Sequence, residues 1–347
     1  EPVAQLTPAD SLQILARLSL DLRGTRPSLA DIQAVQSDDE LLTQLALDFI
    51  DDPGFAPRMA WLWNDTLHTA VFGSSYYRFD GWTTSDWRAV GQEPLQIIEA
   101  VIAEELSFGE IVQSEQTRVD GTLADLWGLS VDLDEGEWAW ASYEDGRPMA
   151  GILSTNTLWL RYDADAVNYN RTRANTVARV FLCSDFLDRE ASFRFDIDAE
   201  SLASIETAVS TEPACLTCHA ALDPLASFFG GFAERSAELP VSDLVVYSHH
   251  NADWFSARRE PAYFGQPATD VMDLGALVAG DPRFSSCVVK RFYRGLVGSE
   301  VGDSEELAAL VGGFDADDQR VQAMVAEIVA TDDYRADRSR VLTTEQL

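Results

Sequence analysis

The sequence predicts a mainly α-helical protein with a short irregular or β insert in its middle. Apolar residues recur at helical spacing in most segments, and residues that favour helix ends stand where several of these patterns begin or stop. In the middle of the chain, the stretch Glu-Trp-Ala-Trp-Ala at 137–141 alternates with the period of a strand instead. Helices therefore account for most of the expected fold.

The N-terminal part is expected to consist of consecutive helices. Thr7 and Pro8 predict the start of the first, because threonine is a favoured N-cap and proline a favoured first residue. Gly24 is expected to end this helix, and Ser28 to cap the second. Three further helices are predicted over residues 41–50, 55–71 and 94–106.

The middle and the C-terminal part are expected to contain a hairpin or irregular loop and a long loop in addition to helices. A small hairpin or irregular loop is expected between residues 127 and 161, with a turn at Glu144-Asp-Gly. Helices are then predicted over 173–187 and 213–229, separated from the last helices by a long aromatic-rich loop over 234–270. The closing helices are expected over 282–296, 305–311 and 317–330.

We divide the chain into three regions that can also form one compact unit. They are an N-terminal helical region (1–110), a central region with the insert (111–200) and a C-terminal helical region (201–347). The length of 347 residues is enough for this many regions, and a hydrophobic content of 46% indicates a globular protein.

The charge of the chain restricts its partners. Asp and Glu number 58 against 25 Lys and Arg, which gives a net charge of −33. Such a surface repels nucleic acid and anionic lipid and would attract a basic partner, although a salty habitat produces the same composition. No apolar run reaches the length of about 18 residues that a membrane span requires. The chain opens without a leader, and we expect that a secretion leader has been removed.

The stretch Cys215-Leu-Thr-Cys218-His219 has the spacing of a c-type haem attachment motif. Two thiols three positions apart near the start of a helix can bond to the two vinyl groups of a haem, and the adjacent imidazole can bind the iron. A dithiol redox motif would be expected in a strand–helix context, and a zinc site would need a second pair of ligands. Neither is evident, so we expect one covalent haem c with His219 as the proximal ligand.

The residues after the motif offer His219 a partner. An axial histidine normally donates its second ring N–H to a carboxylate or a carbonyl. Asp223, or the backbone near Pro224, can take that part. The alternative is that Asp-Pro simply ends the first turn after the motif.

Six segments of the chain carry a resemblance to a known family. They are CLTCHAALDPLASFFGGF around the haem motif and, elsewhere in the chain, ARLSLDLRGTRPSLADIQAV, MAGILSTNTLWLRY, NRTRANTVARVFLCSDFL, DPRFSSCVVKRFYRGLVG and MVAEIVATDDYRADR. In sequence and in order they resemble the planctomycete-type cytochrome c proteins, a family of secreted bacterial haem-motif proteins, although Ala226 and Gly230-Gly231 depart from the family's signature. The resemblance implies a cytochrome c-like, haem-binding C-terminal part. The family's biochemical role is largely unknown.

The second axial ligand stays open between several side chains. Met272 lies after His219 in a predicted loop, in the order used by small cytochromes, and Met149 lies outside any helical stripe. His249 and His250 lie in the long loop and are the remaining candidates. An open distal side is also consistent with the sequence. Three residues on helical stripes are instead expected in structural roles, namely Met59, Met324 and His68.

The two other cysteines, Cys183 and Cys287, lie in apolar runs and are expected to be buried. They could remain free thiols. Because c-type haem is attached outside the cytoplasm, where disulfides persist, we expect a bridge between them. It would close a loop of about 100 residues and stabilise the fold by roughly 4 kcal/mol on the chain-entropy model.

These features predict a periplasmic or extracellular monohaem cytochrome that transfers electrons, to a basic redox partner or inside a larger assembly. One alternative is a haem enzyme, such as a peroxidase, with an open distal site. Another is a surface protein in which haem is structural. A set of arginines in the central region is expected to pair with buried carboxylates or with haem propionates: Arg161, Arg171, Arg173 and Arg179.

Overall fold

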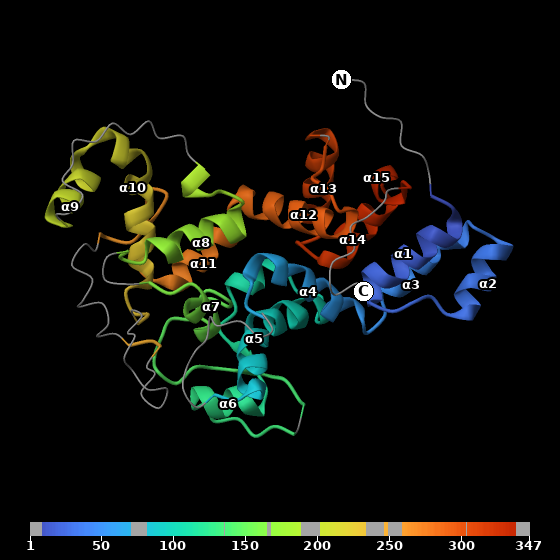
Figure 1. The fold of residues 1–347 in the computed structure, drawn as a ribbon, viewed down its shortest axis with the longest axis horizontal. Coiled ribbons are helices and arrows are strands. Elements are labelled where there is room, and N and C mark those ends of the chain that lie inside the picture. The colour runs from blue at the N-terminus through green and yellow to red at the C-terminus, as the bar shows by residue number, and fades with distance from the viewer. Residues whose placement is uncertain are drawn as a thin grey trace. The chain divides into compact units, whose positions relative to one another are not determined.

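Helices dominate the protein, as the sequence predicts (Figure 1). The structure is a computed structural model that describes residues 9–70, 82–134, 136–164, 168–188, 202–233, 246–248, 259–302 and 304–337. The chain forms two compact units. Unit 1 comprises Glu1–Thr66, Ile98–Phe108 and Ser285–Leu347, and unit 2 comprises Leu67–Ile97 and Gly109–Phe284. Neither unit is one stretch of sequence, so neither coincides with one of the three expected regions.

The N-terminal helices of unit 1 begin and end at local signals. Asp10 caps α1 (Ser11–Arg23) and forms a capping box with Gln13, so α1 starts after the predicted Thr7-Pro8, which lies outside the described residues. Gly24, with φ of 72°, ends α1, and Ser28 caps the next helix; both are confirmed. The helices that follow are α2 (Leu29–Ser37), α3 (Leu41–Ile50) and α4 (Phe55–Leu67).

The C-terminal helices complete unit 1. They are α12 (Pro282–Val297), whose first residues belong to unit 2, α13 (Ser304–Ala316), α14 (Val321–Ala330) and α15 (Asp332–Arg335). The predicted helices at 305–311 and 317–330 are shifted, because α13 continues through Gly312 and Gly313 and the chain turns at Asp318 and Gln319, both with φ of 56°.

The core of unit 1 brings together helices distant in sequence. The rings of Trp63, Phe108 and Phe292 contact one another, with centroids 5.3 to 6.2 Å apart. Met59 and Met324 are fully buried, which confirms that they are core residues. Most of the stability of these helices therefore comes from packing of their apolar faces.

Helix α5 (Thr84–Ala103) begins ten residues before the predicted start at Pro94. Proline inside a helix leaves the carbonyl four residues earlier without its N–H donor. Here the carbonyl of Val90 accepts a hydrogen bond from the Thr157 hydroxyl at 2.8 Å instead. The prediction was wrong because the compensating donor comes from a segment far along the chain.

Unit 2 contains the described strands. Strand β1 (Thr117–Val119) pairs antiparallel with β2 (Ala139–Ala141), and α6 (Gly121–Trp127) lies between them in sequence. The predicted strand near 137–141 is thus confirmed, whereas its partner lies before the expected insert. A second pair is formed by β3 (Ala262–Tyr263) and β4 (Gln266–Pro267). Short 3₁₀ helices are η1 (Phe108–Val112), η2 (Phe186–Asp188) and η3 (Ser227–Phe229).

The other helices of unit 2 are α7 (Asn156–Arg161), α8 (Arg171–Leu182), α9 (Leu202–Thr211), α10 (Pro213–Ala226) and α11 (Val271–Ala279). Helix α10 and η3 together confirm the predicted helix over 213–229. The predicted helix over 173–187 ends early, because Cys183 adopts a left-handed conformation with φ of 49°. Helices α6, α7, α9 and α11 are additions to the predicted set, and α7 lies inside the segment 127–161 that was expected to be a hairpin or irregular loop. Helix α10, drawn in yellow in Figure 1, packs against α8 and α9.

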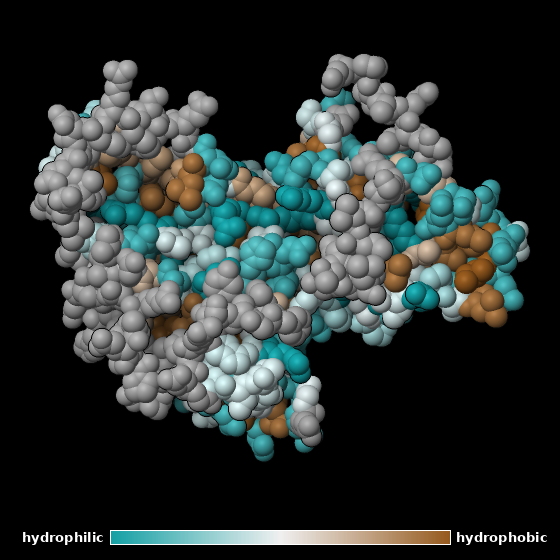
Figure 2. Space-filling view, in the orientation of Figure 1, coloured by the Kyte–Doolittle hydropathy of each residue, from teal (hydrophilic) through white to brown (hydrophobic). Residues whose placement is uncertain are grey.

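Hydrophilic residues cover much of the described part of the face in Figure 2, which agrees with the acidic composition. Among the described residues, no helix is both long enough and apolar enough to pass through a membrane.

Asp281 provides a pH-dependent contact between α12 and β3 in unit 2. Its carboxylate accepts hydrogen bonds from Arg283 Nη2 and from the Tyr263 hydroxyl, both at 2.6 Å. Burial alone would raise the pKa of Asp281, but these hydrogen bonds outweigh it and lower the pKa to about 2.

This pKa predicts an acid-sensitive contribution to stability. Because the pKa is lower in the folded chain than in the unfolded one, the contribution is fully present above about pH 4 and is lost as the pH falls through about 2. Asp281→Asn should lower the free energy of unfolding by about 1 kcal/mol near neutral pH, allowing for solvent screening, and by progressively less as the pH falls through about 2. Urea unfolding of both proteins across this range checks it; a difference independent of pH would contradict it.

Candidate haem-attachment site

Helix α10 carries the Cys-x-x-Cys-His motif in its first turns. Glu212 is its N-cap and Pro213 its first residue, a position where proline costs no hydrogen bond. Cys215, Cys218 and His219 are spaced three and four residues apart, so the helix places them on one face. Cys215 is buried, Cys218 is partly buried, and both are free thiols. The two sulfurs and the imidazole that haem c requires are therefore grouped on one helix face.

Asp223 holds the imidazole of His219. The Nδ1 of His219 lies 2.9 Å from Oδ1 of Asp223, one turn further along α10. Burial of Asp223 raises its pKa, but hydrogen bonds from His219 and Arg171 and the charge of Arg171 lower it below its usual value. An ionised carboxylate can only accept, so Nδ1 carries the proton and Nε2 of the neutral ring carries the lone pair. Nε2 is then the atom able to bind a metal.

Pro224 continues the helix after this pair. It lies inside α10, which extends to Ala226, so the interpretation that Asp-Pro ends the first turn is wrong. The contact to His219 is made by the carboxylate of Asp223. Two partners for His219 were predicted, the side chain of Asp223 and the backbone near Pro224. The side chain of Asp223 is the one that contacts the imidazole.

Among the four central arginines, Arg171 pairs with a buried carboxylate, as one of the two expectations had it, whereas Arg161 donates to the carbonyl of His68 and Arg179 to the hydroxyl of Tyr162. Arg171 makes a two-pronged ion pair with Asp223. Arg173 is fully buried and donates to the carbonyls of Phe232 at 3.1 Å and Ala233 at 2.7 Å. Burial lowers the pKa of Arg173 to about 9. Arg171 thus contacts α10, and Arg173 contacts the chain that follows α10.

Aromatic residues lie beside the second thiol. The Sγ of Cys218 is 3.9 Å from the carbonyl oxygen of Phe186 in η2. The ring of Phe186 stacks on that of Phe264, with centroids 6.1 Å apart and an interplanar angle of 4°. Arg283 lies over the other ring of this pair, 4.2 Å from the centroid of Phe264. The second thiol of the motif therefore lies beside a pair of stacked aromatic rings, which are apolar and polarisable.

The candidates for the second axial ligand differ in their surroundings. Met272 lies in the first turn of α11 rather than in the predicted loop, and 48% of it is exposed. Met149 packs against the apolar cluster around β1, β2 and α6. His249 and His250 lie outside the described residues. His68 follows the last residue of α4 with an exposed side chain, so its predicted place within that helix is wrong.

The other two cysteines, Cys183 and Cys287, are disulfide-bonded in the structure. Cys287 is buried as expected, with 1% exposure. Cys183 is exposed, contrary to the prediction, because it follows the last residue of α8 and the chain turns there. The disulfide-bonded cysteines are thus one exposed and one buried residue. Disulfides of this kind are compatible with an oxidising compartment.

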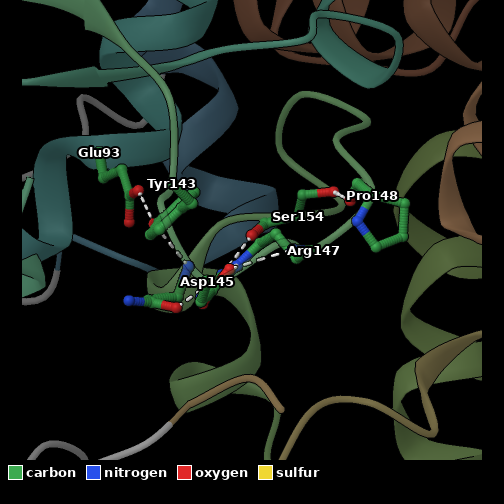
Figure 3. A network of polar contacts seen from close by, with 7 residues as sticks. Glu93, Tyr143, Asp145, Arg147, Pro148 and Ser154 are labelled. Atoms are coloured by element: carbon green, nitrogen blue, oxygen red, sulfur yellow. Dashed lines mark hydrogen bonds and ion pairs between the residues drawn. The ribbon is translucent and has the colours of Figure 1, made fainter. Parts of the chain in front are cut away.

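A second polar centre of unit 2 lies around Glu93 on α5 (Figure 3). This carboxylate is fully buried and accepts hydrogen bonds from Thr117, Thr157 and the Tyr143 hydroxyl. Arg147 lies over the ring of Tyr143, 3.7 Å from its centroid, and pairs with Asp145. Burial raises the pKa of Glu93. This network was not identified from the sequence; its one local signal is a single acidic residue just before Pro94, in a segment (89–98) that is otherwise uncharged.

The network around Glu93 borders a cavity of about 290 Å³. Tyr143, Arg147 and Asn156 line it together with Trp127 and Tyr247. The nitrogens of Arg147 are directed to Asp145, to the Ser154 carbonyl and to Asn156. Because these contacts connect segments of the same unit, the arginine has a structural role here.

Comparison with known proteins assigns neither a family nor a fold relative. No family model matches the chain, no curated protein matches it, and no solved structure matches it.

Proposed function

We propose that this chain is an extracytoplasmic monohaem c-type cytochrome that transfers electrons. The observation that carries the proposal is the grouping of Cys215, Cys218 and His219 on one face of α10, with Nδ1 of His219 held by Asp223. Free thiols and an imidazole with an available Nε2 lone pair are the donor set that haem c requires. When bound, the haem would supply a one-electron couple, and the protein would set its potential.

Each residue has a distinct part in this proposal. Cys215 and Cys218 would hold the porphyrin by thioether bonds, and His219 would bind the iron through Nε2. Asp223 fixes the orientation of the imidazole, since it accepts from Nδ1. Met272, exposed at the start of α11, is our first candidate for the second axial ligand because no core packing occupies it.

The compartment and partner follow from other features. A disulfide at Cys183 and Cys287 and the resemblance to secreted haem-motif proteins support a periplasmic or extracellular location. A net charge of −33 favours a basic redox partner, or a place in a larger redox assembly. Association with such a partner should weaken as salt is raised.

A second candidate, a haem enzyme with an open distal side, is favoured by one observation. The partner of His219 is a carboxylate rather than a neutral carbonyl. An anionic partner makes the imidazole a stronger donor, which stabilises high oxidation states of iron.

A visible spectrum of the purified protein tests the proposal and separates the candidates. An electron carrier should give a low-spin spectrum with covalently bound haem and a reversible one-electron couple. Met272→Leu should convert that spectrum to high spin if Met272 is the second ligand, whereas Met324→Leu, in the core of unit 1, serves as the matched control and should leave the spectrum unchanged. A high-spin wild-type spectrum that changes with peroxide would support the enzyme. Absence of covalent haem would reject both.

A further inference from the structure

Arg171 occupies a position that helix electrostatics disfavours. It is the first residue of α8, where the helix dipole repels a positive charge. Its Nε nevertheless donates to Oδ1 of Asp223 at 2.7 Å, and its Nη2 donates to Oδ2 at 3.1 Å. The two side chains are 16% and 6% exposed, so little water screens the pair. The ion pair offsets the unfavourable dipole.

One oxygen of Asp223 connects Arg171 to the haem motif. Oδ1 accepts from Nε of Arg171 and also from Nδ1 of His219 at 2.9 Å. Charge on the arginine therefore acts directly on the hydrogen bond that holds the imidazole. We call the three residues the Arg171–Asp223–His219 chain.

The turn before α8 adds an independent observation. Tyr169 and Asn170 are consecutive non-glycine residues in the left-handed region, with φ of 54° and 63°. Asn170 is fully buried, and its Oδ1 accepts from Arg173 at 2.8 Å. The guanidinium of Arg171 lies over the ring of Tyr169, 5.4 Å from its centroid. Strained turns persist where the surroundings enforce them, and they gather at functional sites.

We propose that Arg171 is a positioning residue of the haem site. It fixes the carboxylate of Asp223 against His219, and it limits how much electron density that carboxylate adds to the imidazole. This inference rests on the proposed function. Under this inference, Asp223 and Arg171 have opposite effects on the imidazole of His219. Asp223 increases the electron density on the ring and stabilises the oxidised iron, whereas Arg171 withdraws part of that effect.

The opposite effects predict opposite shifts of the midpoint potential. Asp223→Asn removes the negative partner and should raise the potential. Arg171→Gln leaves the carboxylate less neutralised and should lower it. Each change is expected to move the one-electron equilibrium about tenfold, or about 59 mV. Arg171→Lys keeps the charge and should stay near the wild-type value.

The experiment is spectroelectrochemical titration of the haem-loaded proteins, after mass spectrometry has shown equal haem content. Arg23→Gln is the matched control, because Arg23 also pairs with an aspartate, Asp31, at 2.8 Å and its side chain is likewise 16% exposed. It lies in unit 1, remote in sequence from the motif, and should leave the potential unchanged. In an Asp223→Asn background, Arg171→Gln should have no further effect on the potential.

The outcomes distinguish this inference from the proposed function. A wild-type protein without covalent haem overturns the proposed function. The other outcome is that haem is attached at wild-type content but Asp223→Asn and Arg171→Gln shift the potential in the same direction. This result overturns only the role of Arg171, because loss of packing and entry of water act alike in both variants. If Arg171→Gln does not accumulate, Arg171→Met, which also removes the charge but keeps an unbranched side chain, gives the same comparison: a shift that survives Asp223→Asn overturns the role.

Discussion

Replacement of Glu93 by alanine is expected to lower the free energy of unfolding by about 3–5 kcal/mol, because each polar group left unsatisfied in a buried site costs about 1–3 kcal/mol. Glu93 is fully buried. Its Oε2 accepts from the backbone N–H of Thr157 at 3.2 Å and from the hydroxyl of Thr157 at 2.6 Å. Its Oε1 accepts from Thr117 at 2.9 Å and from Tyr143. Alanine would leave these donors unsatisfied beside a cavity.

Urea unfolding measures this loss. Glu115→Ala, at an exposed glutamate of the same unit, is the control and should change stability by less than about 0.5 kcal/mol. A loss for Glu93→Ala below about 1 kcal/mol would show that the network contributes little to stability and would contradict the account.

The double variant Cys183→Ser/Cys287→Ser should lose about 4 kcal/mol of stability. The bridge closes a loop of about 100 residues and restricts the unfolded chain, which is the main origin of such stabilisation on the chain-entropy model. Cys183 is exposed, so serine is tolerated there, and the loss arises from the missing bond rather than from packing at that end.

Treatment with a reductant provides the matched comparison. Reduction should lower the midpoint of urea unfolding of the wild type to that of the double variant and leave the double variant itself unchanged. Peptide mapping without reduction should recover one cross-linked pair containing Cys183 and Cys287. Free thiols at both positions, or equal midpoints before and after reduction, would be incompatible with a stabilising bridge.

The fold was predictable where its determinants are local. Gly24 and Ser28 set helix ends through their own conformations and side chains, and the first predicted residue of α10, Pro213, is correct for the same reason. Helix α5 was predicted too short because the donor that replaces the N–H of Pro94 lies on Thr157, 67 residues from the Val90 carbonyl that it serves. No local pattern contains that information.

The same distinction applies to the candidate site. The contact of Asp223 with His219 was one of two predicted options, because residues four apart on a helix are neighbours. The contact of Arg171 with Asp223 joins residues 52 apart, and the contact of Thr157 with Glu93 joins residues 64 apart. Their pairing depends on how helices pack, so the sequence showed only that arginines and acids were present.

The most direct test of the central claim is the intact mass of the protein after export to a periplasm that contains the haem-attachment machinery, measured under denaturing and reducing conditions. The account predicts that the wild type retains the mass of one haem and that Cys215→Ala/Cys218→Ala loses it, because only thioether bonds survive these conditions. The Cys183→Ser/Cys287→Ser variant should retain the haem. An unmodified wild-type mass, from cells in which a co-expressed c-type cytochrome is fully loaded, would contradict the account.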